Sequence, residues 1–101
     1  MTLNQIREDL KDIKYYYSRK IVFEEAFQST GRSSVLDKVV EYNEIIRTAP
    51  ARMYDLYVSL YIKNHTQESL SDELGYTPEY IQMLNKKLLK FIQNGFNLKG
   101  E

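Results

Sequence analysis

The side chains whose types suit the binding of a polar ligand lie in one short stretch near the C-terminus. Gln82 can form two hydrogen bonds with an adenine, and Glu79 can accept one from a cytosine amino group. Thr77 brings a hydroxyl to the expected start of a helix, where free backbone N–H groups favour phosphate. The other candidates on the outer side of this helix are Tyr80, Met83, Lys86, Lys87 and Lys90, with the three lysines as phosphate contacts. These residue types indicate nucleic-acid recognition.

Charge gives this interpretation limited support. Residues 78–93 carry three lysines against one glutamate, a local charge of +2, but residues 67–74 carry three acidic side chains and no basic one, a charge of −3. The whole chain has 14 basic and 14 acidic residues. We therefore expect weak, strongly salt-dependent DNA binding by the chain alone. Lysines near a helix end also suit the helix dipole and solubility, and Tyr80 could instead pack against the preceding helix.

Two helices joined by a tight turn must position these side chains. In the first helix, Leu70 and Leu74 lie four residues apart on one face, and Ser71 is small where the second helix must cross. Gly75 follows at once, in a position where the left-handed backbone closes a helix.

The second helix has an equally clear start. Thr77 is a good N-cap and Pro78 suits the first helical position. Ile81, Leu84 and Leu88 then recur at three and four residues and form an inward stripe. The combination favours a helix-turn-helix over a plain αα-hairpin, which needs only two amphipathic helices and a turn.

The rest of the chain also predicts helices, so the expected fold is all-α: a helical bundle with a long N-terminal helix and a C-terminal helix-turn-helix. The predicted helices run from about Leu3 to Gln28, from about Val35 to Arg47 and from about Ala51 to Lys63. Turn formers over 29–34 separate the first two, and Pro50 separates the second from the third. The inward positions are Leu3, Ile6, Leu10, Ile13 and Tyr17 in the first helix, Val35, Val39, Tyr42 and Ile46 in the second, and Met53, Leu56, Leu60 and Tyr61 in the third.

The predicted organisation has three parts. Residues 1–49 form an N-terminal helical region for packing or dimerisation, and residues 50–93 form the helix-turn-helix region. The Asn94-Gly95 pair is expected to stop the last helix, which leaves residues 94–101 as a frayed tail.

Composition excludes several kinds of protein. Hydrophobic residues make up 43% and charged residues 28%, a balance that argues against global disorder. With no cysteine and His65 as the only histidine, we expect no disulfide and no metal site. No nucleophile–base pair and no glycine-rich phosphate loop is apparent, so we expect neither an enzyme nor a cofactor. The N-terminus does not resemble a secretory signal and no run is long enough to span a membrane, so we expect a cytoplasmic protein.

Nine tyrosines are a further feature of the composition. Tyr15, Tyr16 and Tyr17 are consecutive, so a helix points them in three directions and leaves at least one exposed. The tyrosines suit amphipathic packing with each hydroxyl in water, and a partner surface is the alternative.

Two segments of the chain together resemble a known family. Tyr57-Val58-Ser59-Leu60-Tyr61-Ile62, followed by Thr66-Gln67-Glu68-Ser69-Leu70-Ser71-Asp72-Glu73-Leu74-Gly75-Tyr76-Thr77, resembles the region 4 helix-turn-helix of bacterial sigma factors. Closer still is a resemblance to the small ArpU-type regulators of Gram-positive phages and mobile elements. The motif resemblance covers residues 54–92, and the N-terminal part matches only in layout.

The resemblance implies a transcription regulator, of phage or mobile-element origin, that reads double-stranded DNA with the helix from Thr77 to Phe91. This chain departs from the family pattern, because the reading helix has no arginine and begins with the acidic Glu79. The departure leaves room for a protein partner such as RNA polymerase, and a homodimer through the N-terminal helices is a further expectation. The rival hypotheses are a protein-interaction module that docks on RNA polymerase or another regulator without reading bases, and a purely structural helical protein.

Overall fold

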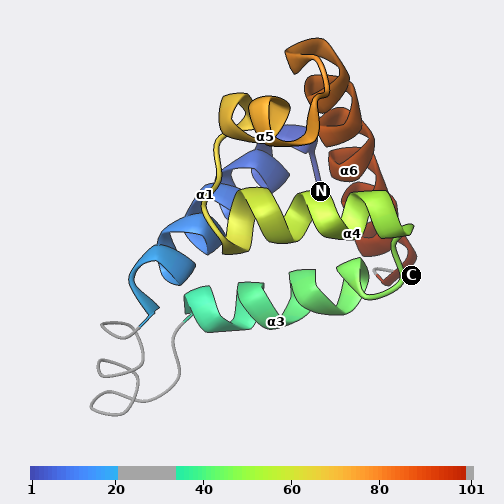
Figure 1. The fold of residues 1–101 in the computed structure, drawn as a ribbon. Coiled ribbons are helices and arrows are strands. Elements are labelled where there is room, and N and C mark those ends of the chain that lie inside the picture. The colour runs from blue at the N-terminus through green and yellow to red at the C-terminus, as the bar shows by residue number, and fades with distance from the viewer. Residues whose placement is uncertain (21–33, 100–101) are drawn as a thin grey trace.

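The computed structural model describes residues 1–20 and 34–99, and within these residues the fold is all-α, as predicted (Figure 1). The elements are α1 (Leu3–Ser18), α3 (Ser34–Ile46), α4 (Ala51–Tyr57), the π-helical turn η1 (Val58–Ile62), α5 (Gln67–Leu74) and α6 (Pro78–Lys99). In Figure 1, α3 and the continuous α4–η1 helix run in opposite directions, and α6 descends along one side of the molecule.

Helix α1 begins at a capping box and buries the predicted stripe. The Thr2 hydroxyl accepts a 3.1 Å hydrogen bond from Gln5 N, and the Gln5 side chain accepts one of 2.7 Å from Thr2 N. Of the predicted inward positions, Ile6, Leu10 and Ile13 are buried, and Leu3 and Tyr17 pack at the edge of the core. The predicted extension of this helix to Gln28 and residues 29–33 of the turn predicted over 29–34 lie outside the described residues, whereas Ser34 is the first residue of α3.

One core unites the two halves of the chain. Its buried side chains come from α1, α3, α4, η1, α5 and α6, so the helix-turn-helix region shares its core with residues 1–49. Of the inward positions predicted for the second and third helices, Val39, Tyr42, Ile46, Leu56 and Leu60 are buried, whereas Val35, Met53 and Tyr61 are partly buried against them.

The third helix ends in a wide turn that the periodicity did not predict. The helix spans about the expected residues. At its end, however, the Lys63 N–H donates to the Val58 carbonyl at 2.8 Å, five residues back instead of the four of an α-helix. The His65 N–H then donates to the Ser59 carbonyl at 2.9 Å, and Asn64 adopts a left-handed conformation with φ 62°. Asn tolerates this conformation better than most residues, which suits the sharp exit toward α5.

The predicted end of the last helix is wrong. Helix α6 continues through Asn94 and Gly95 to Lys99. Gly95 lies inside the helix at a point where α3 approaches closely: a Cβ at this position would lie 2.6 Å from Cγ2 of Ile45. Here glycine provides room for a neighbouring helix, which sequence alone does not distinguish from a helix stop.

The segment predicted as a frayed tail is held against α3 as far as Lys99. The Phe96 ring packs edge-on against Tyr42, with the ring centroids 4.9 Å apart. The Lys99 ammonium lies 2.8 Å from a Glu44 carboxylate oxygen, and this contact lowers the pKa of Glu44. Contacts from two residues therefore order the last turn of α6.

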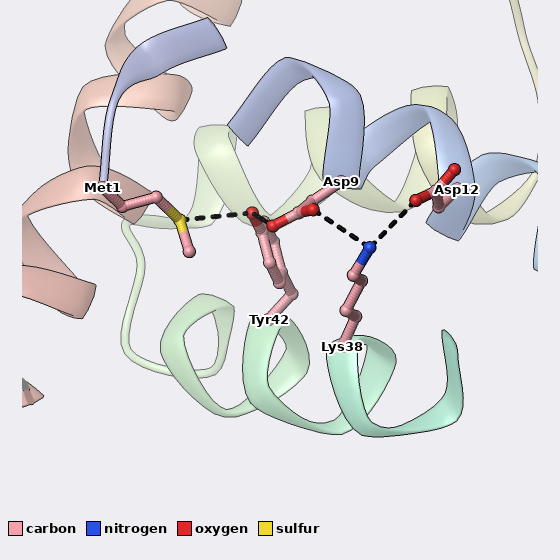
Figure 2. Close-up of polar contacts among 5 residues, drawn as sticks. All are labelled: Met1, Asp9, Asp12, Lys38 and Tyr42. Atoms are coloured by element: carbon pink, nitrogen blue, oxygen red, sulfur yellow. Dashed lines mark hydrogen bonds and ion pairs between the residues drawn. The ribbon is translucent and has the colours of Figure 1, made fainter. Parts of the chain in front are cut away.

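A polar cluster connects α1 to α3 (Figure 2). The Lys38 ammonium lies 3.0 Å from an Asp12 oxygen and 3.2 Å from an Asp9 oxygen, and hydrogen bonds to Asp12 and then Asp9 raise the pKa of Lys38. The Tyr42 hydroxyl donates to Asp9 at 2.8 Å and lies 3.7 Å from the Met1 sulfur. Burial, followed by the bond to Asp9, raises the pKa of Tyr42 far above its ordinary value.

The expectation that each tyrosine hydroxyl reaches water is wrong for Tyr42 and Tyr57, which are each 1% exposed and bond to protein groups. Tyr57 donates to Asn43 at 3.2 Å, and the amide of Asn43 donates to the Tyr17 hydroxyl at 3.2 Å. Tyr61 donates to Asn85 at 2.8 Å. Tyr15 is 52% exposed, which confirms that at least one of the three consecutive tyrosines faces solvent. These hydrogen bonds connect α1 and α4 to α3, and η1 to α6.

Candidate nucleic-acid interface

Helix α5 ends where the sequence predicts, and its start is capped. The Thr66 hydroxyl accepts a 3.0 Å hydrogen bond from Ser69 N, which caps the helix. Gly75 closes it in the left-handed conformation with φ 70°. Leu70 is buried, but Leu74, one turn further on, is 56% exposed. Only the first of the two leucines anchors α5 in the core.

Ser71 connects α5 to the turn. Its side chain is buried, and its hydroxyl donates a hydrogen bond to the carbonyl oxygen of Tyr76. The predicted reason for a small residue here was the crossing of the second helix, whereas the contact that Ser71 makes is with the backbone of the turn. The bond holds the turn against the C-terminal end of α5.

Helix α6 begins at the predicted cap and buries the predicted stripe. The Thr77 hydroxyl accepts a 3.2 Å hydrogen bond from Tyr80 N, and Pro78 is the first helical residue. Ile81 and Leu88 are fully buried, and Leu84 packs at the edge of the core. The Thr77 hydroxyl is thus already in use as a cap acceptor, although it remains at the solvent-exposed start of the helix.

The predicted contact residues share the outer face of α6. The side chains at these positions are exposed to solvent, and their spacing of three and four residues places them along one stripe. They are Glu79, Gln82, Met83, Lys86, Lys87 and Lys90. Helix α6 therefore presents one mostly polar stripe to solvent over about three turns.

Tyr80 differs from the other predicted contacts because its side chain is half-buried. Its ring packs edge-on against Tyr76 in the turn, with the centroids 4.9 Å apart. Its hydroxyl accepts a 2.8 Å hydrogen bond from the guanidinium of Arg52 on α4. The contacts of Tyr80 are therefore with the turn and α4, and the ring helps to fix the first turn of α6.

Arg52 is a basic residue of this region that sequence reasoning missed. It is exposed, and its bond to Tyr80 places a permanent positive charge beside the start of α6. The two residues are 28 positions apart in the sequence, and neither lies in a motif that predicts the contact. Arg52 partly offsets the three acidic residues of α5.

Comparisons with known proteins do not assign this chain to a family. No protein-family model matches it, and neither the curated proteins nor the solved structures include a match. Among the residues that the structure describes, no helix is both long enough and apolar enough to cross a membrane.

Proposed function

We propose that the chain is a DNA-binding transcriptional regulator of the sigma-region-4-like helix-turn-helix class, with α6 as the reading helix. The observation that carries the proposal is the exposed stripe on α6, which combines Gln82 with three lysines. The opposite face of the same helix is buried in the core and keeps this stripe directed to solvent. The capped start of α6 and the left-handed Gly75 fix where this stripe begins.

In this proposal the polar residues of α6 have two roles, contacts with bases and contacts with phosphates. Gln82 and Glu79, near the start of the helix, contact base edges, whereas Lys86, Lys87 and Lys90 contact phosphates. Phosphate contacts position the protein without reading sequence, and base contacts supply the preference. The acidic side chains of α5 oppose the approach to DNA, so we expect affinity for non-specific DNA to be low at physiological salt.

A dimer through the predicted stripe of α1 is not compatible with the packing of this chain. Ile6, Leu10 and Ile13, three of the inward positions predicted for the first helix, are each at most 1% exposed because they fill the interior of the same chain. A homodimer would need another surface.

Fluorescence anisotropy on duplex DNA tests the proposal. Replacing both Lys86 and Lys87 with Gln should weaken binding to all sequences, and Gln82→Ala should reduce the preference among sequences without a uniform loss. Lys11→Gln, an exposed change on α1, is the matched control. Unchanged binding in the lysine double variant would contradict the assignment of α6 as the reading helix.

The second candidate function is docking on RNA polymerase or another regulator without reading bases. Apolar side chains exposed around the start of α6 favour it: Leu74, Tyr76 and Met83. Pull-down of a polymerase subunit that persists after nuclease treatment would support this candidate, and recovery that disappears with the DNA would contradict it.

A further inference from the structure

A cavity of about 310 Å³ lies between the α4–η1 helix, α5 and the first half of α6. Its floor is apolar and buried, and consists of Leu56, Leu70 and Ile81. The volume is near the lower end of the range for small-molecule pockets, which is about 300–1,000 Å³. The size and the floor suit a small ligand with an apolar body.

Two basic and two acidic side chains line this cavity: Arg52, Lys63, Asp55 and Glu73. Arg52 and Asp55 line it from the same face of α4, three residues apart, so their Cβ atoms are about 5–6 Å apart. Within the described residues, no ion pair involves either of them. Arg52 uses one nitrogen to bond Tyr80, which leaves most of its five N–H donors for another group.

We propose that the cavity binds a free α-amino acid with an aliphatic side chain. The Arg52 guanidinium would pair with the ligand carboxylate and the Asp55 carboxylate with the ligand ammonium, because these two ligand groups are also adjacent. The aliphatic side chain would lie on Leu56, Leu70 and Ile81. An apolar side chain from a partner protein would cover the same floor but leave the charges of Arg52 and Asp55 without a partner, so the free zwitterion is the better match.

The ligand would lie beside the reading helix, and this consequence rests on the proposed function. Ile81 belongs to the cavity floor and to α6, and Arg52 lines the cavity and holds Tyr80. A ligand carboxylate on Arg52 competes with phosphate for the same positive charge. Occupancy is therefore expected to lower the affinity for DNA.

Methyl NMR on the full chain, labelled at Ile and Leu methyl groups, tests the site without DNA. L-Leucine should cause saturable shifts at Leu56, Leu70 and Ile81 and leave Ile45, near the other end of α6, unchanged. Two analogues each lack one charge: 4-methylpentanoate has no ammonium, and 3-methylbutylamine has no carboxylate. Each should bind about ten-fold more weakly or worse, because it cannot form one of the two charged hydrogen bonds.

Substitutions of the two charged residues provide a second test of the site. Arg52→Gln and Asp55→Asn should each weaken L-leucine binding about ten-fold, and Lys11→Gln should leave it unchanged. The Ile45 methyl shift reports whether each variant is folded, and the analogue series on the unaltered chain carries the test if one is not. Absence of saturable shifts with L-leucine, or equally tight binding of either analogue, would overturn the proposal. Leucine binding by a chain that does not bind DNA would support the site while contradicting the proposed function.

Discussion

The guanidinium of Arg52 donates a 2.8 Å hydrogen bond to the Tyr80 hydroxyl, which joins α4 to the first turn of α6. The same tyrosine ring packs on Tyr76 in the turn that precedes α6. The start of the proposed reading helix is therefore held from two sides, and one of the two contacts also supplies a positive charge.

The charge of Arg52 and its hydrogen bond can be separated by mutation. Arg52→Gln should lower DNA affinity several-fold and reduce the slope of log affinity against log salt by about 1, since the variant neutralises one phosphate fewer. Tyr80→Phe keeps the ring and the guanidinium, so the salt slope should not change. Anisotropy titrations over a salt series measure both. Equal slopes for Arg52→Gln and the unaltered chain would show that this charge does not face the DNA.

Gly75→Ala tests the backbone of the turn alone. An added Cβ would meet no atom within 4 Å, so any loss of stability comes from the positive φ of 70°. We expect a loss of about 1–2 kcal/mol in the free energy of unfolding, measured by urea denaturation. Gly75→Asn is the control and should lose less, because Asn tolerates the left-handed region. Equal stability of the Ala variant and the unaltered chain would contradict the assigned turn.

Gly95→Ala tests the close approach of α6 to α3. The new methyl group would lie 2.6 Å from Cγ2 of Ile45, and such overpacking costs about 1–3 kcal/mol. This cost opposes a gain of about 1 kcal/mol from the better helix propensity of Ala. We expect a net loss of stability, measured by thermal and urea unfolding.

The effect of Gly95→Ala on the free energy of unfolding should change sign when the Ile45 side chain is shortened. In an Ile45→Ala background the added methyl meets no Ile45 side chain, so Gly95→Ala should stabilise the protein by up to about 1 kcal/mol. The same loss in both backgrounds would show that the helix ends near Asn94 in solution.

Stability should fall in alkaline solution because of the interior tyrosines. The pKa values of Tyr42 and Tyr57 are raised chiefly by burial, and Asp12 and Asp9 raise the pKa of Lys38. A raised pKa means that the folded chain holds its proton more tightly than the unfolded chain does. The resulting stability is complete below the unfolded tyrosine pKa of about 10 and is lost as pH rises above it.

Tyr42→Phe should flatten this alkaline decline, since the variant has no hydroxyl to ionise beside Asp9. Urea unfolding at a series of pH values between about 8 and 11 measures the slope, and Tyr15→Phe, a change at an exposed position, should leave it unaltered. An identical decline in the Tyr42 variant would indicate that other groups control alkaline unfolding.

Local signals made part of this fold predictable. The left-handed Gly75 and the Thr77-Pro78 start each depend on residues within one turn of the chain, and the structure has both in place. The buried stripes follow from helical periodicity in the same way.

Contacts between distant residues were not predictable. Sequence alone indicates a helix stop at Gly95, because the closeness of Ile45 depends on the fold. No sequence pattern predicts the hydrogen bond between Arg52 and Tyr80. The π-helical turn at Val58–Ile62 depends on how the chain leaves η1 toward α5, including the left-handed Asn64. These features arise from tertiary packing, which sequence spacing does not encode.

The salt dependence of duplex DNA binding shows whether α6 contacts DNA phosphates. Anisotropy of the full chain on fluorescent duplexes, from low to physiological salt, should give binding that weakens steeply, with a slope set by the lysines of α6 and by Arg52. Replacing Lys86, Lys87 and Lys90 with Gln should reduce the slope by about 0.9 for each phosphate that the variant no longer neutralises. No binding at low salt, or binding whose salt slope the three substitutions leave unchanged, would contradict a DNA-reading role for α6.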